Sequence, residues 1–452
     1  MSDKRQYLVA VIGAGPAGLY AAQYLARQGV QVVLFNRDIK PGGLAEYGIF
    51  PDKHKMRKGL MAHFRRILAM PSVIYQGNVT IGQSGDIKLD QLRRAGFQAF
   101  MVTTGAQQNN WLGLPGEDLG GVYHANSIVF HYNRLPGNNV QRIELGQEVA
   151  VIGVGNVMLD IVHYIKQNHK DCTVTAYGRR GPTEVKFDME TLEPVASCLD
   201  LDAVKAAVEE SSPAVENVGK NLEGFFSILK GAREKSIECN SDLRFKMKFL
   251  RTPRRLIGDD SAQKGSAERV RAIEFEINQL IYEDGNVASR GTGKIEIVPA
   301  DTVIFSIGSH VDPGFGLPVG RGNYLTTSNP RFPVDGISYE VYNPDLCAYC
   351  EDIFVSGWAR LASEGIVGLA RKDAERGAKA LLQYLETLQP NSQEGLRQAL
   401  NQLPIVEKRV VNFADLEILW EAERKIALEK GWSDYKFDTN AEMLGVIEKG
   451  SR

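Results

Sequence analysis

Two stretches of the chain share one order of apolar and polar positions. Residues 10–25 read AVIGAGPAGLYAAQYL, and residues 150–165 read AVIGVGNVMLDIVHYI. In each stretch a short apolar run leads into a glycine turn, and the apolar positions that follow recur at helical spacing. This pattern predicts a β-strand, a tight turn and an α-helix, which open a nucleotide-binding βαβ module, at two places in the chain.

Turn-rich stretches on either side of the second module indicate how the domains are divided. Residues 105–121 and 308–330 are dense in Gly, Pro and Asn, which are residue types that mark turns and loops. An apolar strand precedes each stretch, at 100–105 and at 303–308, and we expect these strands to cross between domains. The pattern predicts an α/β fold of two Rossmann-like, three-layer domains, one of them inserted into the other. The expected boundaries are 1–105 and 308–452 for the discontinuous domain, and 106–307 for the inserted domain.

Two further segments have helical character. Residues 201–240 are polar and helix-like, and we expect Pro213 to interrupt them. Residues 410–431 are predicted to form the end of a strand followed by an amphipathic helix.

The glycines of the first module have the spacing of a dinucleotide-binding turn. Gly13 allows the tight turn, Gly15 lets the backbone approach a pyrophosphate, and Gly18 lets the helix pack closely on the strand. Pro16 and Ala17 begin the helix, whose unpaired N–H groups and positive dipole end favour an anion. A Gly-x-Gly-x-x-Gly pattern alone is weak, but directly after an apolar strand it is a strong indication of a dinucleotide site.

The strand at residues 30–35 is expected to end in an acidic residue that binds ribose hydroxyls, and Asn36 stands there instead. An asparagine can still hydrogen-bond a hydroxyl. The alternative is a strand-terminating turn asparagine, and both interpretations remain open.

The second module predicts a second pyrophosphate site from Gly153, Gly155 and the backbone of Asn156 and Val157. Met158 occupies the position where a small residue is usual. We expect its long side chain either to push the helix away from the strand or to find an unusually open pocket.

An arginine pair follows the next strand of the second module. Arg179 and Arg180 stand where an NAD site would carry a carboxylate. Paired guanidinium groups suit a 2′-phosphate. The pattern therefore predicts NADPH rather than NADH as the nucleotide of the inserted domain.

Composition excludes several classes of function. The formal net charge is −2, which gives no overall attraction to nucleic acid or to an anionic membrane. The apolar runs are too short for a membrane span, and the beginning of the chain has no cleavable leader pattern. The five cysteines are scattered, which favours reduced thiols and a cytoplasmic protein. Cys347 and Cys350 form a CxxC pair, but without further ligands at metal spacing we expect no metal site and a structural role for the pair.

A basic run follows the Gly-bearing loop PGGLAEYG. It comprises Lys53, His54, Lys55, Arg57 and Lys58. Clustered cations can dock an acidic protein, although charge runs are more often solvated faces. A second basic stretch, residues 246–256, has the same two interpretations.

Over nearly its whole length, the chain resembles the adrenodoxin reductase-like family of ferredoxin–NADP reductases. The matching motifs are VIGAGPAGLY, GGLAEYGIFPD, LPGEDLGGVYHA, VIGVGNVMLD, YGRRGP and VSGWARLASEGIV. The resemblance implies that the discontinuous domain binds FAD and the inserted domain binds NADP(H). It further implies hydride transfer from NADPH to the flavin, and then delivery of single electrons to a ferredoxin or similar acidic iron–sulfur protein.

The resemblance also assigns residues to each cofactor. FAD would be held by Ala17, Leu44, Val79, Trp358 and the backbone of Gly365, Ile366 and Val367, with Gly43 and Gly105 beside them. NADPH would be held by Val154, Gly155, Asn156, Val157, Arg179 and Arg180, and Gly365 would also touch the nicotinamide. The candidate catalytic residues are His54, Trp358, Glu364 and Gly365.

Some positions depart from the family pattern. The family's histidine after the Pro-Asp pair is Lys53 here, with His54 one place further on. The family's Arg-Gly-Pro-Thr-Gly loop reads Leu-Ala-Ser-Glu-Gly at 361–365, which places the carboxylate of Glu364 beside the expected nicotinamide.

Other functions remain open. One is an NADPH-oxidising subunit similar to the glutamate synthase small subunit. That family carries an N-terminal cysteine cluster for iron–sulfur centres, and the first cysteine of this chain is Cys172, which counts against this function. Another is a disulfide reductase that uses Cys347 and Cys350. A third is a scaffold that binds FAD but no longer oxidises NADPH.

Overall fold

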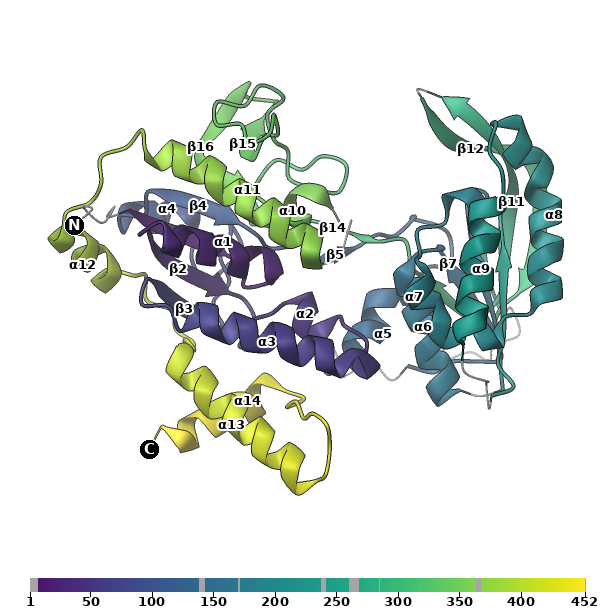
Figure 1. Ribbon diagram of the computed structural model, residues 1–452, viewed down its shortest axis with the longest axis horizontal. Helices are drawn as coiled ribbons and strands as arrows, with labels where there is room; N and C mark the ends of the chain where they lie inside the picture. The colour runs from purple at the N-terminus through teal and green to yellow at the C-terminus, as the bar shows by residue number, and fades with distance from the viewer. Residues whose placement is uncertain are drawn as a thin grey trace. The chain divides into compact units, whose positions relative to one another are not determined.

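The computed structural model describes residues 7–137, 143–169, 171–236, 241–259, 268–283, 285–362 and 367–451. The chain divides into two compact units (Figure 1). Unit 1 comprises residues 1–109, 130–140 and 308–452, and unit 2 comprises residues 110–129 and 141–307. The domain boundaries expected from the sequence remain a prediction. In the structure the described residues 130–137 group with unit 1.

Unit 1 is built on a six-stranded sheet of order β15-β16-β4-β1-β2-β3. The strands from β16 to β3 are parallel, and β15 pairs antiparallel to β16 at the edge. Their bounds are β1 (Leu8–Ile12), β2 (Gln31–Asn36), β3 (Val73–Gly77), β4 (Ala99–Val102), β15 (Glu340–Asn343) and β16 (Ala348–Val355). A separate two-stranded pair is formed by β5 (Gln108–Asn109) and β14 (Ser309–His310).

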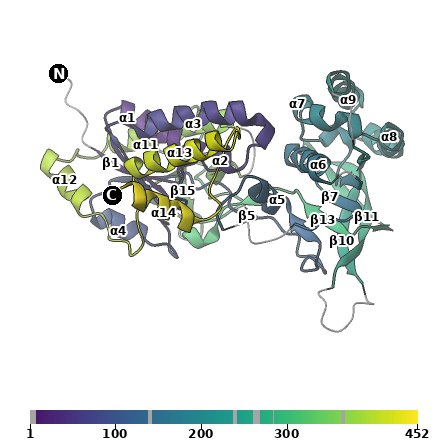
Figure 2. The same ribbon diagram turned by 90° about the horizontal axis from the view of Figure 1, so that it is seen from below.

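Helices cover both faces of this sheet. Val9 and Val11 of β1 face a core that contains residues of α1, α3, α11, α13 and α14. Leu8, Ala10 and Ile12 face a second core with residues of α4 and α12. Because successive strand side chains point to opposite faces, the uninterrupted apolar run of β1 matches a strand buried on both sides. Figures 1 and 2 both show α1 beside α11 and α13 beside α14.

The helices of unit 1 begin and end as follows: α1 (Pro16–Arg27), α2 (Leu44–Tyr47), α3 (His54–Leu68), α4 (Leu89–Arg94), α10 (Trp358–Leu361), α11 (Val367–Leu385), α12 (Gln393–Asn401), α13 (Phe413–Glu429) and α14 (Asn440–Gly450). The prediction for 410–431 is confirmed. Val411 pairs with Gly77, and Asn412 then caps α13 by accepting the Asp415 N–H at 3.0 Å.

Unit 2 has a five-stranded parallel sheet of order β6-β13-β7-β8-β9. Its strands are β6 (Val122–His124), β7 (Glu148–Ile152), β8 (Thr173–Tyr177), β9 (Arg244–Lys248) and β13 (Thr302–Phe305). A three-stranded antiparallel sheet comprises β10 (Arg251–Gly258), β11 (Val270–Glu283) and β12 (Asn286–Pro299). The two sheets share an apolar core, in which Ile152 and Phe305 lie with Ile273 and Phe275.

Helices of unit 2 are α6 (Asn156–Asn168), α7 (Met189–Leu192), α8 (Leu201–Asn217) and α9 (Glu223–Lys235), and α5 (Ala125–Tyr132) runs from unit 2 into unit 1. The expected break at Pro213 is wrong, because α8 continues through it. The Ser211 and Ser212 hydroxyls each donate to the Val208 carbonyl at 2.9 Å, in the turn that precedes the proline.

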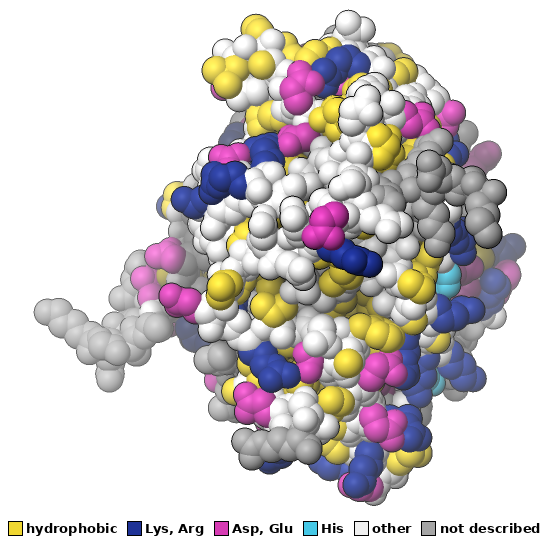
Figure 3. All heavy atoms as spheres, turned by 90° about the vertical axis from the view of Figure 1, so that its left-hand side faces the viewer, with side chains coloured by type: hydrophobic (Ala, Val, Ile, Leu, Met, Phe, Trp, Pro, Cys, Tyr) yellow, Lys and Arg dark blue, Asp and Glu magenta, His cyan; other side chains and the backbone are white. Residues whose placement is uncertain are grey.

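Within the described part of the chain, no helix is both long and apolar enough to cross a bilayer. Figure 3 shows one face of the molecule, on which basic and acidic side chains are interspersed. This mixture agrees with a formal net charge of −2.

Candidate dinucleotide sites

The first glycine turn lies between β1 and α1. The Gly13 N–H donates to the Phe35 carbonyl at 2.8 Å, and its φ is 103°, a conformation that favours glycine. A Cβ on Gly13 would lie 2.6 Å from the Thr103 carbonyl oxygen, and a Cβ on Gly18 would overlap the Gly13 carbonyl oxygen. Both glycines are therefore required by close backbone packing.

Gly15 is different, because a Cβ placed on it would meet nothing within 4 Å. It is the N-cap of α1, and Pro16 is the first helical residue. The N–H groups of a first helical turn have no partner within the helix, and the dipole makes that end positive. The end of α1 thus offers donors beside open space, which is the cradle that a pyrophosphate needs.

Two other loops meet this turn. The Gly42 N–H donates to the Ala14 carbonyl at 2.7 Å, and a Cβ on Gly43 would lie 3.0 Å from Gly15 Cα. Gly105 follows β4 with φ of 71°, and a Cβ there would also meet nothing within 4 Å. The residues around α1 therefore fit the ADP part of a dinucleotide cofactor.

Asn36 ends β2 and is 8% exposed. Its Oδ1 accepts the Ala14 N–H at 3.0 Å, and its Nδ2 donates to the carbonyls of Asp38 and Lys40 at 2.9 and 3.0 Å. These bonds tie the glycine turn to the loop after β2, as the turn interpretation of Asn36 requires. A contact to ribose remains a prediction.

The other residues expected at FAD also lie in unit 1. Leu44 begins α2, Val367 begins α11, and the buried Val79 donates its N–H to the Asn36 carbonyl at 2.9 Å. Trp358 is half-buried and begins α10. The preceding residue, Gly357, would place a Cβ 2.6 Å from the Cβ of Ala17, so this turn borders the first turn of α1. Glu364, Gly365 and Ile366 lie outside the described residues.

A buried ionic cluster supports the loop after β2, and nothing in the sequence pattern singles it out. The Lys40 Nζ lies 2.7 Å from Glu46 Oε1 and 2.9 Å from Glu423 Oε2. The Lys436 Nζ donates to the Glu46 carbonyl at 2.6 Å. Burial lowers the pKa of Lys436 to about 8, whereas for Lys40 the two carboxylates outweigh burial and raise its pKa. The cluster joins the α2 loop to α13 and to the segment that follows it.

The second glycine turn lies between β7 and α6. The Gly153 N–H donates to the Tyr177 carbonyl at 2.9 Å, φ is 121°, and a Cβ would overlap the Ser306 carbonyl oxygen. Gly155 is the N-cap of α6. The Val154 carbonyl accepts the Lys186 N–H at 3.0 Å, and the Asn156 side chain bonds Asp188 through both its amide atoms. These contacts fix the turn, whose geometry parallels that of the first.

Met158 is fully buried in unit 2. The helix therefore takes a long side chain into the core at the position where the first module requires glycine. The two outcomes expected from the sequence, a helix pushed away from the strand or an unusually open pocket, remain predictions.

Arg179 and Arg180 follow the carboxyl end of β8, directly beside the Gly153 turn. Arg179 is exposed and Arg180 is half-buried. Their carbonyls accept hydrogen bonds from Asn278 Nδ2 at 2.8 Å and from the Leu250 N–H at 3.2 Å. The structure thus brings the glycine turn and the arginine pair to one edge of the sheet of unit 2.

The basic runs are only partly exposed. Arg57 is 6% exposed and paired with Asp434, so its expected docking role was wrong. Lys53, Lys55 and Lys58 are exposed, and His54 is half-buried at the start of α3.

The second basic stretch carries acidic partners. Lys248 and Arg251 pair with Glu296, while Arg254 pairs with Glu276 and Arg255 with Glu274. These pairs neutralise the stretch, which weakens the docking interpretation of residues 246–256.

The cysteine pair lies at the β15–β16 hairpin. Cys347 is exposed in the turn with φ of 48°, and Cys350 lies within β16. The described residues contain no group of three or more His, Cys, Asp or Glu side chains that could hold a metal ion.

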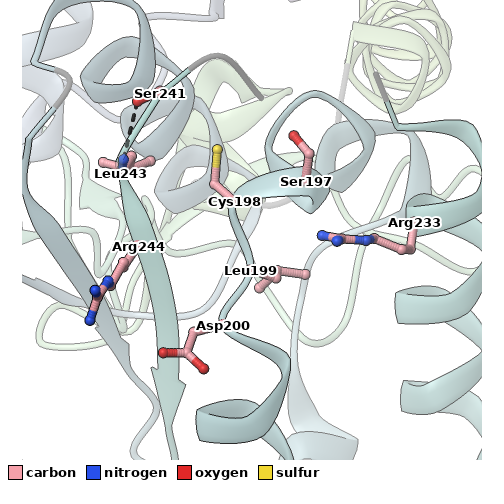
Figure 4. Close-up of a pocket in the computed structure, with 8 residues that line it drawn as sticks. All are labelled: Ser197, Cys198, Leu199, Asp200, Arg233, Ser241, Leu243 and Arg244. Carbon is pink, nitrogen blue, oxygen red and sulfur yellow. Dashed lines mark hydrogen bonds between the residues drawn. The ribbon is translucent and has the colours of Figure 1, made fainter. Parts of the chain in front are cut away.

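A cavity of about 440 Å³ lies elsewhere in unit 2. It is lined by Ser197, Cys198, Leu199, Asp200, Arg233, Ser241, Leu243 and Arg244 (Figure 4). Arg244 begins β9, so this cavity lies at the amino ends of the strands. The Gly153 turn lies at the carboxyl ends, where ligands of open parallel sheets bind.

The chain is similar to known proteins over most of its length. The model of the pyridine nucleotide-disulphide oxidoreductase family matches residues 7–240, more than half of the 452 residues. The mitochondrial NADPH:adrenodoxin oxidoreductase of Salvelinus fontinalis is 29% identical, over 97% of this chain and 90% of that protein. NADPH-ferredoxin reductase FprA of Mycobacterium leprae is 25% identical, over 97% of this chain and 98% of that protein.

The fold is shared with a solved structure. Mycobacterium tuberculosis FprA in complex with NADPH superposes with a TM-score of 0.79 at 23% identity, covering 98% of this chain and 100% of that one. The α/β fold predicted from the sequence and the resemblance to ferredoxin–NADP reductases are both confirmed. With both glycine turns in place, the chain belongs to the pyridine nucleotide-disulphide oxidoreductase family.

Proposed function

We propose that the chain oxidises NADPH and passes the electrons through FAD to a ferredoxin-type iron–sulfur protein. The observation that carries this function is the pair of glycine turns, of which only the second is followed by two arginines. Relatives that match nearly the whole chain are named NADPH:adrenodoxin oxidoreductase and NADPH-ferredoxin reductase. One NADPH gives up a hydride, which is two electrons and a proton, and each acceptor takes one electron.

Unit 1 would hold FAD. The end of α1 and the open faces of Gly15 and Gly105 leave room for its pyrophosphate, and Trp358 borders the same helix through Gly357. Bound FAD supplies the step from a two-electron donor to one-electron acceptors. The role of the protein chain is to bind the cofactor, orient it and exclude water.

Unit 2 would hold NADPH. The end of α6 would accept the pyrophosphate, and Arg179 with Arg180 would bind the 2′-phosphate by charge-assisted hydrogen bonds. The roles of His54, Glu364 and Gly365 near the reacting rings belong to the same proposal.

An acidic iron–sulfur protein would dock at the exposed cations Lys53, Lys55 and Lys58, which lie on α3 and directly before it. These lysines follow the loop that contains Gly42 and Gly43, so the proposed docking residues are close in sequence to the proposed flavin site. Opposite charges there would speed the encounter.

Anaerobic titration of the FAD-loaded protein tests the first half of the reaction. Addition of NADPH is expected to bleach the yellow flavin band promptly, and NADH to do so far less effectively. A yellow protein that neither nucleotide bleaches would refute the proposal and favour a scaffold that binds FAD without oxidising NADPH.

A further inference from the structure

The turn from Gly357 to Leu361 connects β16 to the proposed flavin site. The Gly357 carbonyl accepts the N–H groups of Arg360 and Leu361 at 3.0 and 2.9 Å, and φ of Gly357 is 66°. Trp358 is the second residue of this turn. Because Gly357 packs against Ala17, any displacement of the turn moves Trp358 relative to the end of α1.

A carboxylate on α11 forms hydrogen bonds to this turn. Asp373 is 5% exposed, and its Oδ2 accepts the Gly357 N–H at 2.7 Å. Its Oδ1 accepts Arg360 Nε at 3.1 Å and is also bonded by the Arg360 Nη2. One side chain thus grips the turn at its first residue and three residues further on.

A buried tyrosine completes the group. The Tyr339 hydroxyl donates to Asp373 Oδ1 at 3.4 Å, and the Arg360 guanidinium lies 4.7 Å from the centre of the Tyr339 ring. Burial, reinforced by Asp373, raises the pKa of Tyr339 to about 12, so its hydroxyl stays a proton donor at neutral pH. We call Asp373, Arg360 and Tyr339 the Asp373 clamp.

We propose that Asp373 is a positioning residue for the flavin reaction, which holds the turn of Trp358 in place and neutralises Arg360. The inference rests on the proposed function, because it takes Trp358 to lie at the flavin. The Asp373 side chain bonds the Gly357 N–H and the Arg360 guanidinium, the residues on either side of Trp358 and Ala359. Loss of the carboxylate would free the turn and leave the positive charge of Arg360 uncompensated in a partly buried place.

The experiment compares FAD-loaded Asp373→Asn and Asp373→Ala with the wild type. Asparagine keeps an acceptor for the Gly357 N–H but removes the charge, and alanine removes both. We measure the absorption and emission of the oxidised flavin, and then the rate of flavin reduction against NADPH concentration in single turnovers. Glu375→Gln is the matched control, because Glu375 forms an exposed ion pair with Arg371 on the same helix.

We expect the limiting rate to fall by about tenfold or more in Asp373→Ala, since a 1 Å displacement can cost about 100-fold. The flavin spectrum should shift, the NADPH concentration for half-maximal rate should stay the same, and Glu375→Gln should match the wild type. The inference is overturned if both Asp373 variants unfold at lower temperature yet keep the wild-type spectrum and limiting rate. Should the alanine variant not load FAD, the asparagine variant decides by the same criteria.

Failure of the proposed function would look different. The wild type itself would bind FAD and show no reduction by NADPH. The flavin absorption and emission of the Asp373 variants would then still report whether the clamp positions Trp358 at the flavin, and an unchanged spectrum would reject it.

Discussion

Gly18 has no room for a side chain, because a Cβ there would overlap the Gly13 carbonyl oxygen. We expect Gly18→Ala to force α1 away from β1 and to destabilise the protein by about 1–3 kcal/mol, as overpacking does. It should also weaken FAD retention during gel filtration. Gly59→Ala is the control, because Gly59 lies in α3 with open space around it, so alanine there should be neutral or slightly stabilising. Equal FAD retention in both variants would contradict the proposal that the glycine turn before α1 holds the pyrophosphate of FAD.

Arg179 and Arg180 are expected to select NADPH by its 2′-phosphate. Hydrogen bonds to charged groups contribute about 1.5–3 kcal/mol, so Arg179→Ala should raise the KM for NADPH by about 10- to 100-fold. The KM for NADH, which lacks that phosphate, should change little. Steady-state kinetics with both nucleotides measures this, and equal losses for NADPH and NADH would assign the arginines a structural role instead.

Local pattern predicted these residues because each glycine acts within its own strand–turn–helix unit. It did not show that Arg57 is buried, since its partner Asp434 lies 377 residues further on. Nor did it show that the cations of 248–255 pair with Glu274, Glu276 and Glu296 on β11 and β12. Exposure of a charge depends on tertiary contacts that a single run of sequence does not contain.

At the scale of elements, the buried ionic cluster links the α2 loop to the chain after α13. Lys436 faces Glu46, Lys40, Arg57 and Asp434, and its pKa falls from 10.5 to about 8 mainly through burial. The unfolded chain therefore binds more protons than the folded one between about pH 8 and 10.5. The contribution of this lysine to stability consequently improves as pH rises through that window.

Lys436→Met should remove this pH dependence. Between pH 8 and 9.5 the free energy of unfolding of the wild type should rise relative to that of the variant, as measured by urea denaturation at several pH values. Taking the difference between the two proteins cancels titrations that they share. Parallel stability curves would show that Lys436 titrates normally in the folded protein.

The elements themselves were predictable where a pattern repeats over a turn or a strand. Both βα units and the helix of residues 413–429 were found in this way. The continuation of α8 through Pro213 was missed, because the burial of Val208, Ser211 and Val215 around it is tertiary packing, which the local helix-breaking tendency of proline does not reveal. The antiparallel sheet of β10, β11 and β12 was not foreseen, because its pairing depends on contacts between residues far apart in the sequence.

The net charge of −2 gives the molecule as a whole no attraction for an acidic partner, so docking of such a partner depends on local surface charges. Replacing Lys53, Lys55 and Lys58 together by glutamate should raise the KM for ferredoxin, most strongly at low salt, since surface attraction is screened by ions. Reduction of a small uncharged dye by NADPH should be unaffected. Lys205→Glu, an exposed charge reversal on α8, serves as the control. An unchanged KM for ferredoxin would place the docking surface elsewhere.

In the proposed function, the two electrons from one NADPH leave the protein singly. The most direct measurement mixes the FAD-loaded protein anaerobically with a limiting amount of NADPH and an excess of oxidised ferredoxin, and follows the iron–sulfur absorption. We expect two ferredoxins to be reduced for each NADPH, and none with protein from which FAD has been removed. Flavin that is bleached by NADPH but reduces no ferredoxin would contradict it.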